Sequence, residues 1–330
     1  MSGLAMSSQW MKFDVERETL RIVESLRHIL ARDLKRRGLV VGLSGGIDSS
    51  VTTALAVKAV GRERVFGLLM PERHSDEETL DLSRSVADCF SVEYVHENIS
   101  AILEAVGFYQ RYDAAVRDEI PDYGAGWKSK IVLREAGEAN SFSFFEVVAE
   151  SPAGESTRKR LPLKSYLEIV AATNFKQRIR KMLEYYHADR LNFAVAGTPN
   201  RLEYDQGFFV KNGDGSADVK PIAHLYKSQV YEMAEYLQVP ETVRRRPPTT
   251  DTYSLAQGQD EFYFLVPYHQ MDLCLYGKNH GLAAEQVAAA AGLTVEQVRR
   301  VWLDIDRKRS ATRYLHLPPV LVDAVPGIEL

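Results

Sequence analysis

The stretch Gly42-Leu43-Ser44-Gly45-Gly46-Ile47-Asp48-Ser49-Ser50 decides the fold of this 330-residue chain. It follows a short apolar run, Leu39 to Val41, and precedes an amphipathic run, Val51 to Val60. That order predicts a strand, a glycine turn and a helix. Glycines let the backbone turn tightly and approach a ligand closely, and the free N–H groups at the start of a helix attract an anion. The stretch therefore predicts an anion-binding loop.

The side chains of the loop indicate the kind of anion. Asp48 supplies a carboxylate for a divalent metal ion, and Ser49 supplies a hydroxyl group for a phosphate oxygen. The pattern resembles the pyrophosphate loop, SGGxDS, of the ATP pyrophosphatases, which activate a carboxylate or a similar group as an adenylate. This resemblance implies that ATP is a co-substrate.

Other glycine-rich loops fit less well. A Walker loop needs Gly and Lys where this chain has Ile47 and Asp48, and a dinucleotide fingerprint needs Gly at Ser44. Residues 42–46 do satisfy the nucleophile elbow of hydrolases, GxSxG, but several strands precede the elbow in that fold, and here only one helix-like segment does. A glycine turn without a ligand would leave the Asp-Ser-Ser after the two glycines unexplained. The nucleophile elbow and a glycine turn without a ligand both stay as alternatives.

Composition narrows the class of protein. Hydrophobic residues make up 45% of the chain and charged residues 26%, as is ordinary for globular proteins. The net charge of -4 does not suggest a general nucleic-acid binder. Cys89 and Cys274 lie far apart without a pairing or zinc pattern, which fits a reducing compartment. No run has the length of a membrane span or a signal peptide, so we expect a soluble cytoplasmic protein without membrane or nucleic-acid partners.

Apolar periodicity predicts strands that alternate with helices. Such alternation is typical of an α/β fold with a doubly wound, mostly parallel sheet that helices cover on both faces. We expect one domain over residues 1–330. Ser75 and Glu78 have the spacing of a capping box at the start of one helix. The predicted strands are 39–43, 65–70, 92–95 and 191–196, and the predicted helices are 13–37, 48–60, 75–90 and 167–186.

Residues 108–165 do not follow this alternation of strands and helices. The segment contains several glycines and prolines and an aromatic run, Phe142 to Phe145. Long irregular segments in compact domains are often functional. We therefore expect an insertion that forms a lid or a substrate wall over one end of the sheet and is not part of the core. Within it, Arg158 to Arg160 is expected to be a solvated turn.

Residues 281–330 are predicted to be a C-terminal helical segment. Thr294 and Gln297 form a capping box after a turn at Gly292. The helix-turn-helix spacing allows DNA binding through Arg299 and Arg300. The acidic balance of the chain favours an ordinary pair of packed helices instead.

Polar residues follow the last predicted strand directly. In open parallel sheets, ligands bind beyond the carboxyl ends of the strands, so Thr198 and Glu203 should lie near the ligand of the glycine loop. Glu203 is expected to bind Mg²⁺ together with Asp48, because this ion uses a few carboxylates plus phosphate oxygens. Alternatively, Glu203 is a first-turn acid that offsets a helix dipole. The basic residues of 174–180 are either an exposed helix face or part of the site.

The ordered series SGGIDSS, NFKQRIR, GTPNRLE, KNGDGSAD, LYK and RPPT resembles that of the ammonia-dependent, single-domain NAD synthetases. The spacing is similar over residues 13–106 and 166–310. The resemblance implies a Rossmann-like fold of the pyrophosphate-loop ATPase type. It also implies ATP-dependent amidation of deamido-NAD by ammonia through an acyl-adenylate, with release of AMP and pyrophosphate.

The resemblance also implies roles for individual residues. In the C-terminal segment the family has Glu-His-Lys-Arg where this chain has Asp306-Arg307-Lys308-Arg309, so Arg307 replaces a histidine. The implied catalytic residues are Asp48, Lys227 and Lys308, and the implied magnesium ligands are Asp48 and Glu203. The implied ATP contacts are Gly42, Leu43, Ser44, Gly45, Gly46, Ile47, Asp48, Ser49, Thr198, Lys227 and Thr249. The implied contacts to deamido-NAD are Arg178, Lys211, Asp218, Arg307 and Lys308.

Two other functions stay open. Arg307 and the insertion favour a related adenylating ligase that acts on a different carboxylate. A nucleotide-binding regulator without catalysis would need the loop but not the metal pair Asp48 and Glu203. Glutamine-dependent relatives carry an extra amidase domain for which this chain has no room, so we expect free ammonia or a separate glutaminase as the nitrogen source. A homodimer is also expected from the family.

Overall fold

The computed structural model describes residues 10–135, 143–247, 252–258 and 263–327. Its central sheet has the strand order β3-β2-β1-β7, and all of its pairs are parallel. The strands are β1 (Leu39–Gly42), β2 (Val65–Leu69), β3 (Glu93–His96) and β7 (Ala194–Ala196). Since β1 lies between β2 and β7, the loop that follows it opens at the middle of the sheet.

Helices cover both faces of this sheet, as the sequence predicts. Val41 packs in one apolar cluster with α2 (Val15–His28), α3 (Ile47–Val60) and α9 (Lys227–Tyr236). The neighbouring Val40 points the other way and packs in a second cluster. The helices of that cluster are α5 (Ser100–Ala105), α6 (Phe108–Arg117) and α7 (Leu163–Leu191). Burial on both faces explains why the strands read as continuous apolar runs.

The ends of some elements differ from the prediction. The helix predicted from residue 75 is α4 (Glu77–Cys89), and its N-cap is Asp76, whose side chain accepts a hydrogen bond from Glu78 N. The predicted cap Ser75 instead accepts one from Glu72 N at 3.1 Å. A π-helical turn, Ile29–Asp33, follows α2, and a 3₁₀ turn, Arg62–Arg64, follows α3. Helix α7 has 29 residues and is longer than predicted.

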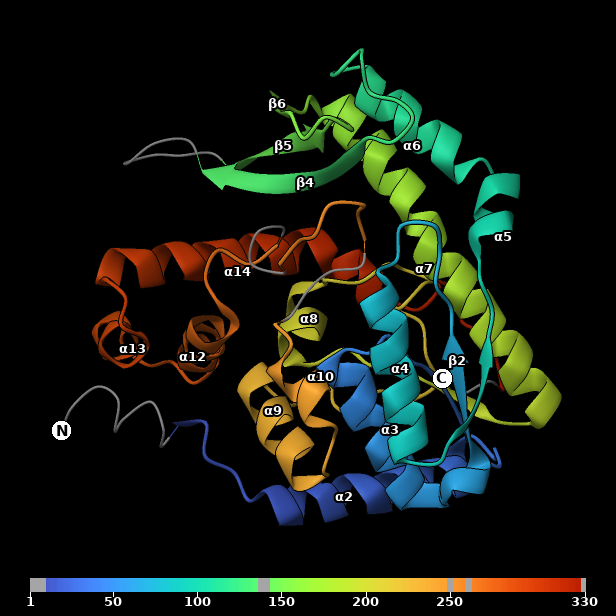
Figure 1. Cartoon of the computed structure of the whole chain (residues 1–330). Helices are drawn as coiled ribbons and strands as arrows, with labels where there is room; N and C mark the ends of the chain where they lie inside the picture. Colours follow the sequence, from blue (N-terminus) through green and yellow to red (C-terminus); the bar gives the residue numbers. More distant parts are fainter. Residues whose placement is uncertain (1–9, 136–142, 248–251, 259–262, 328–330) are drawn as a thin grey trace.

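The segment 108–165 has regular structure. After α6 it forms an antiparallel sheet of β4 (Lys128–Glu135), β5 (Ser143–Glu150) and β6 (Ser156–Arg160), in the order β4-β5-β6. The expected turn at 158–160 is the end of edge strand β6. The expectation that the whole segment lies outside the core is wrong for α6 and for one face of the small sheet. Phe108 and Tyr112 of α6, Ile131 of β4 and Val147 of β5 are all buried in the second cluster with Ile169 of α7. The small sheet overhangs one end of α7 (Figure 1).

The C-terminal segment forms a third apolar cluster. It contains α12 (Tyr268–Asn279), α13 (Ala284–Ala291) and α14 (Val295–His316). The predicted capping box at Thr294 and Gln297 is present. Val287 and Val298 are buried between these helices, which is the ordinary helix packing that the composition favours. Two short helices, α8 (Arg201–Gln206) and α10 (Glu241–Arg245), complete the elements of the described residues.

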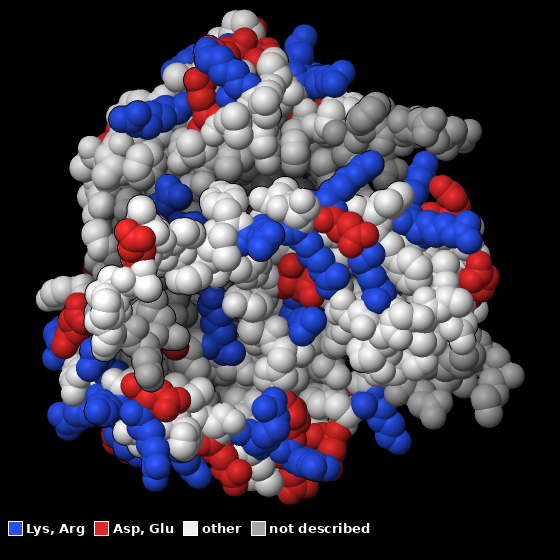
Figure 2. Space-filling view, turned by 180° about the vertical axis from the view of Figure 1, so that it is seen from behind, with Lys and Arg blue, Asp and Glu red and all other residues white. Residues whose placement is uncertain are grey.

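The surface mixes both signs of charge. Figure 2 shows Lys and Arg side chains interspersed with Asp and Glu over the face that it presents. Cys89 and Cys274 are both free thiols; Cys89 is exposed and Cys274 is buried. Within the described residues, none of the helices combines the length and the apolar character that a membrane crossing requires.

Candidate active site

A cavity of about 470 Å³ opens where the strands β1, β2 and β7 end. Its lining includes every residue of the glycine loop from 42 to 49 except Gly45, together with one side of α7. Gly45 has a φ of +67°, and a Cβ there would lie 2.8 Å from the carbonyl oxygen of Thr79. This glycine therefore allows the turn and the close packing of α4 and does not itself border the cavity.

The loop leads directly into α3. Gly46 is the N-cap, and its carbonyl oxygen accepts hydrogen bonds from Ser49 Oγ at 3.0 Å and Ser50 Oγ at 2.8 Å. The hydroxyl of Ser44 lies 3.1 Å from Ser49 Oγ and 3.4 Å from Gly46 N. Within the described part of the chain, no histidine is bonded to Ser44, as a hydrolase triad would require. This geometry favours the phosphate loop over the nucleophile elbow.

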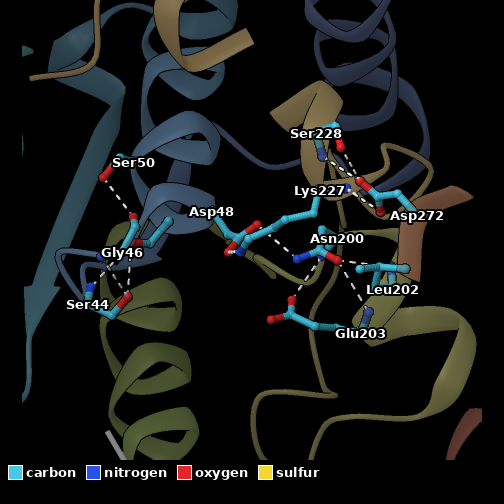
Figure 3. A network of polar contacts seen from close by, with 11 residues as sticks. Ser44, Gly46, Asp48, Ser50, Asn200, Leu202, Glu203, Lys227, Ser228 and Asp272 are labelled. Carbon is cyan, nitrogen blue, oxygen red and sulfur yellow. Dashed lines mark hydrogen bonds and ion pairs between the residues drawn. The ribbon is translucent and has the colours of Figure 1, made fainter. Parts of the chain in front are cut away.

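Asp48 meets the residues that follow β7 (Figure 3). Its carboxylate forms an ion pair with Lys227 Nζ and accepts a hydrogen bond from Asn200 Nδ2 at 3.0 Å. Asn200 is the N-cap of α8, and its backbone N–H donates to Glu203 Oε2 at 3.1 Å. One asparagine thus holds both predicted metal ligands at the entrance to α3.

Lys227 is the first residue of α9 and is buried. Burial disfavours its charge, but the Asp48 and Glu203 carboxylates outweigh burial and hold the pKa of Lys227 above its ordinary value. Asp272 fixes the start of α9 by accepting from Lys227 N at 3.1 Å and from Ser228 N at 2.7 Å. Burial raises the pKa of Asp272 to about 6 despite these hydrogen bonds. The site therefore presents a fixed cation next to two carboxylates.

The donor set fits a magnesium ion. Asp48 and Glu203 both border the cavity, and Asn200 orients both carboxylates. Among the described residues, no group of three or more His, Cys, Asp or Glu side chains forms a metal cage. Mg²⁺ is commonly bound by one or two carboxylates together with the phosphates of its substrate. A nucleotide triphosphate on the loop would supply the remaining oxygens.

Other predicted contacts lie beside the cavity. Thr198 borders it, whereas Thr249 falls outside the described residues. The cavity lining of the single chain does not include Arg178, Lys211 or Asp218. These three residues have partners within the chain. Arg178 Nε donates to the carbonyl of Lys211 at 3.2 Å, Lys211 Nζ to that of Tyr314 at 2.7 Å, and Val195 N to Asp218 Oδ2 at 2.7 Å.

Arg307 and Lys308, the predicted site residues of the C-terminal segment, are placed differently from the residues of the glycine loop. Lys308 Nζ donates to the Tyr263 carbonyl and to Asp304 Oδ2, both at 2.5 Å, and burial lowers the pKa of Lys308. Tyr263 borders the cavity, so Lys308 supports its wall. Arg307 is exposed on α14 and is not part of the lining.

Sequence reasoning missed several buried charges. Lys176, within the basic run 174–180, borders the cavity and forms a buried ion pair with Glu72 at 2.6 Å. Lys181 pairs with Glu184 at 2.6 Å on the same helix face. Asn200 could have been found from its capping-box spacing to Glu203. Glu72, which pairs with Lys176, and Asp272, which accepts from the backbone N–H of Lys227, lie in no sequence pattern that points to these contacts, because they come from remote segments.

A parallel sheet, a glycine loop at its middle and a lysine–carboxylate pair beside that loop define a nucleotide-binding enzyme of the ATP pyrophosphatase class. The chain belongs to the NAD synthase family, whose model matches residues 18–121 and 151–313. The family uses ATP as a co-substrate, and the chain is accordingly a carbon–nitrogen ligase.

Named relatives cover almost the whole chain. An NH(3)-dependent NAD(+) synthetase of Rhizobium meliloti is 62% identical, over 99% of this chain and 97% of its own length. One of Thermotoga maritima is 35% identical, over 82% of this chain and 89% of its own. The structure of an NH3-dependent NAD synthetase from Campylobacter jejuni in complex with the nitrate ion aligns over 94% of this chain and all of its own. The TM-score is 0.62 and the identity 20%, a likeness of fold.

Proposed function

We propose that this chain makes NAD by joining ammonia to the carboxylate of deamido-NAD at the expense of ATP. The observation that carries the proposal is the cluster at the start of α3, where Lys227 pairs with Asp48 and Asn200 holds Glu203 beside them. The relatives at 57–62% identity, which are named NH(3)-dependent NAD(+) synthetases, support the same reaction.

The first step activates the carboxylate. A carboxylate is a resonance-stabilised anion with a poor leaving group, so ammonia does not displace its oxygen in water. An oxygen of the deamido-NAD carboxylate attacks the α-phosphorus of ATP, the bond to the β-phosphate oxygen breaks, and pyrophosphate leaves. The backbone amides of the loop and the charged Lys227 stabilise the negative charge that develops on the leaving group. Asp48 and Glu203 would hold Mg²⁺, which neutralises phosphate charge.

The second step forms the amide. Ammonia adds to the acyl carbon, AMP leaves with the electron pair of the broken carbon–oxygen bond, and the added nitrogen loses a proton to solvent. No side chain acts as a covalent nucleophile, which agrees with the placement of Ser44 against Ser49. The protein contributes mainly position, because both reactants lie at the mouth of one loop.

We also propose which residues bind the substrates, where the ammonia comes from and how the chain assembles. Arg178, Lys211, Asp218 and Lys308 contribute to binding of deamido-NAD, and Thr249 to binding of ATP. The chain works in the cytoplasm on free ammonia or on ammonia from a separate glutaminase.

The chain forms a homodimer, for which the outer face of α7 is suited, because Met182 and Tyr186 are 57% and 61% exposed there. Light scattering of the parent protein and of Met182→Glu tests the dimer.

Pyrophosphate release tests the reaction. The assay contains ATP, magnesium and ammonium, with deamido-NAD first and other carboxylates after it. We expect deamido-NAD to give the highest kcat/KM and NAD to appear in equal amount with AMP. A higher value with another carboxylate would assign the chain to a different adenylating ligase, and binding of ATP without turnover would assign it to a regulator.

A further inference from the structure

The cavity extends along one face of α7. Tyr166, Val170, Asn174, Gln177 and Lys181 border it and recur every three or four residues, which is the spacing of a single helix face. The same face continues to Glu184, whose Oε1 would lie 2.9 Å from a Cβ built on Gly42 of the glycine loop. From Tyr166 to Glu184 the helix rises by about 27 Å, at ~1.5 Å per residue. The two ends of this face are therefore far apart.

The end remote from the loop has an aromatic wall. The ring of Phe145, on β5, stacks on that of Tyr166 with 4.3 Å between centroids and 16° between planes. Both residues border the cavity. The backbone is fixed there as well, because Leu161 N donates to the Phe145 carbonyl at 2.8 Å. The small sheet thus presents a positioned pair of parallel rings to the ligand space.

Half of this wall lies outside the stretches that the family model matches. The model leaves residues 122–150 unmatched, and Phe145 lies within that range, whereas Tyr166 lies in the matched stretch 151–313. Positioned aromatic faces bind planar heteroaromatic rings, since such rings prefer offset stacking and bring little entropy cost. The wall therefore has the chemistry of a specificity element for a flat base.

Length decides which base reaches the wall. In the proposed reaction the triphosphate of ATP lies on the loop, and only one ribose and one base extend beyond it, so ATP reaches less far along the face of α7 than a dinucleotide does. The dinucleotide begins at the α-phosphorus with its pyridine carboxylate and extends by two nucleotides from there. Resting on the proposed function, we infer that Phe145 and Tyr166 form the binding platform for the adenine of deamido-NAD.

Steady-state kinetics of Phe145→Ala test this platform. We expect the KM for deamido-NAD to rise roughly five- to a hundredfold, as for loss of one base-stacking contact, while the KM for ATP stays within about twofold. Phe145→Trp keeps a ring and should restore the KM. Phe144→Ala is the matched control, because Phe144 neighbours Phe145 on β5, is not part of the cavity lining and packs under Arg160 at 4.9 Å.

Nicotinate mononucleotide is deamido-NAD without its adenylate half. It therefore distinguishes binding of the pyridine ring from binding of the adenine. Its inhibition constant against deamido-NAD should be the same in Phe145→Ala as in the parent protein. A raised KM for ATP, a raised inhibition constant for the mononucleotide, or an unchanged KM for deamido-NAD in a folded variant would each overturn the platform. Failure of the parent protein to amidate deamido-NAD would instead refute the proposed function.

Discussion

Two of the buried lysine–carboxylate pairs at the cavity, Lys176 with Glu72 and Lys227 with Asp48, differ in how far their side chains are exposed. In the pair of Lys176 and Glu72 the side chains are 3% and 1% exposed. In the pair of Lys227 and Asp48 the lysine is 2% exposed, but the carboxylate is 16% exposed. The first pair is sealed, whereas the second presents its carboxylate to the ligand space.

The partners of the two pairs explain the difference. Both oxygens of Glu72 are occupied, by Lys176 Nζ at 2.6 Å and by Tyr109 OH at 2.9 Å, and Lys176 also donates to the Thr252 carbonyl at 2.9 Å. This pair joins the loop after β2 to α6, α7 and residue 252. A buried charge with all its partners supplied by the protein holds structure together, whereas a carboxylate that reaches the cavity is available to a ligand.

The largest expected effect is on the sealed pair. Lys176→Met leaves the Glu72 carboxylate buried without its cation, which costs about 3–5 kcal/mol of unfolding free energy. Urea denaturation measures it. The double variant Glu72→Leu with Lys176→Met should recover most of that loss, because apolar pairs often replace buried ion pairs at little cost.

Full stability of Lys176→Met together with loss of turnover would reverse the assignment of roles. Lys176 would then be a group that contacts the substrate, and the comparison between a sealed and an open pair would fail.

The open pair should show the opposite behaviour. Asp48→Asn keeps the shape of the side chain but removes the charge that Lys227 and a metal ion require. We expect pyrophosphate release to fall by about a hundredfold or more, as when a transition-state electrostatic contact is lost. The unfolding midpoint should fall less than in Lys176→Met, because Glu203 remains as a second carboxylate beside the buried Lys227. Turnover at the parent rate under saturating magnesium would remove Asp48 from the metal site.

Local patterns predicted the sheet and its loop because their causes are local. Val40 and Val41 read as a buried strand, and Gly46 followed by Asp48 reads as a helix start above a ligand, whatever the rest of the chain does. The confirmed capping box at Thr294 has the same origin. The position after the last predicted strand indicated Glu203, and the family resemblance located Lys227. The structure brings both residues to the side of Asp48.

Contacts between remote segments could not be predicted in this way. Glu72 and Lys176 are separated by 104 residues, and neither lies in a pattern that names the other. The small sheet was missed because the glycines and prolines of residues 108–165 obscure three short strands. Gly154, for example, has a φ of +83° in the tight turn between β5 and β6, so there a glycine marks a hairpin and not an irregular loop.

A smaller effect is expected at Ser44, which belongs to neither pair. Ser44→Ala removes one hydroxyl contact to the phosphates and to Ser49, which costs roughly 1–3 kcal/mol of transition-state stabilisation. Pyrophosphate assays measure it as a drop in kcat/KM. Labelling of Ser44 by a fluorophosphonate probe would revive the hydrolase elbow and would make the open lysine–carboxylate pair irrelevant to catalysis.

The smallest expected effect is the response of the sealed pair to acid. Burial opposes ionisation of Glu72, but the adjacent Lys176 outweighs it and lowers the pKa of Glu72 below its ordinary 4.5. The folded state therefore favours the charged form, and its stabilisation is complete above pH 4.5 and is lost as pH falls through the lowered pKa. Glu72→Gln should flatten the fall of the unfolding free energy at acid pH, which is the acid limb of its pH profile.

Glu104→Gln is the control, because its ion pair with Arg73 at 2.8 Å is exposed and contributes little. An acid limb of the same slope in Glu72→Gln as in the parent protein would show that the sealed pair is not the group that titrates.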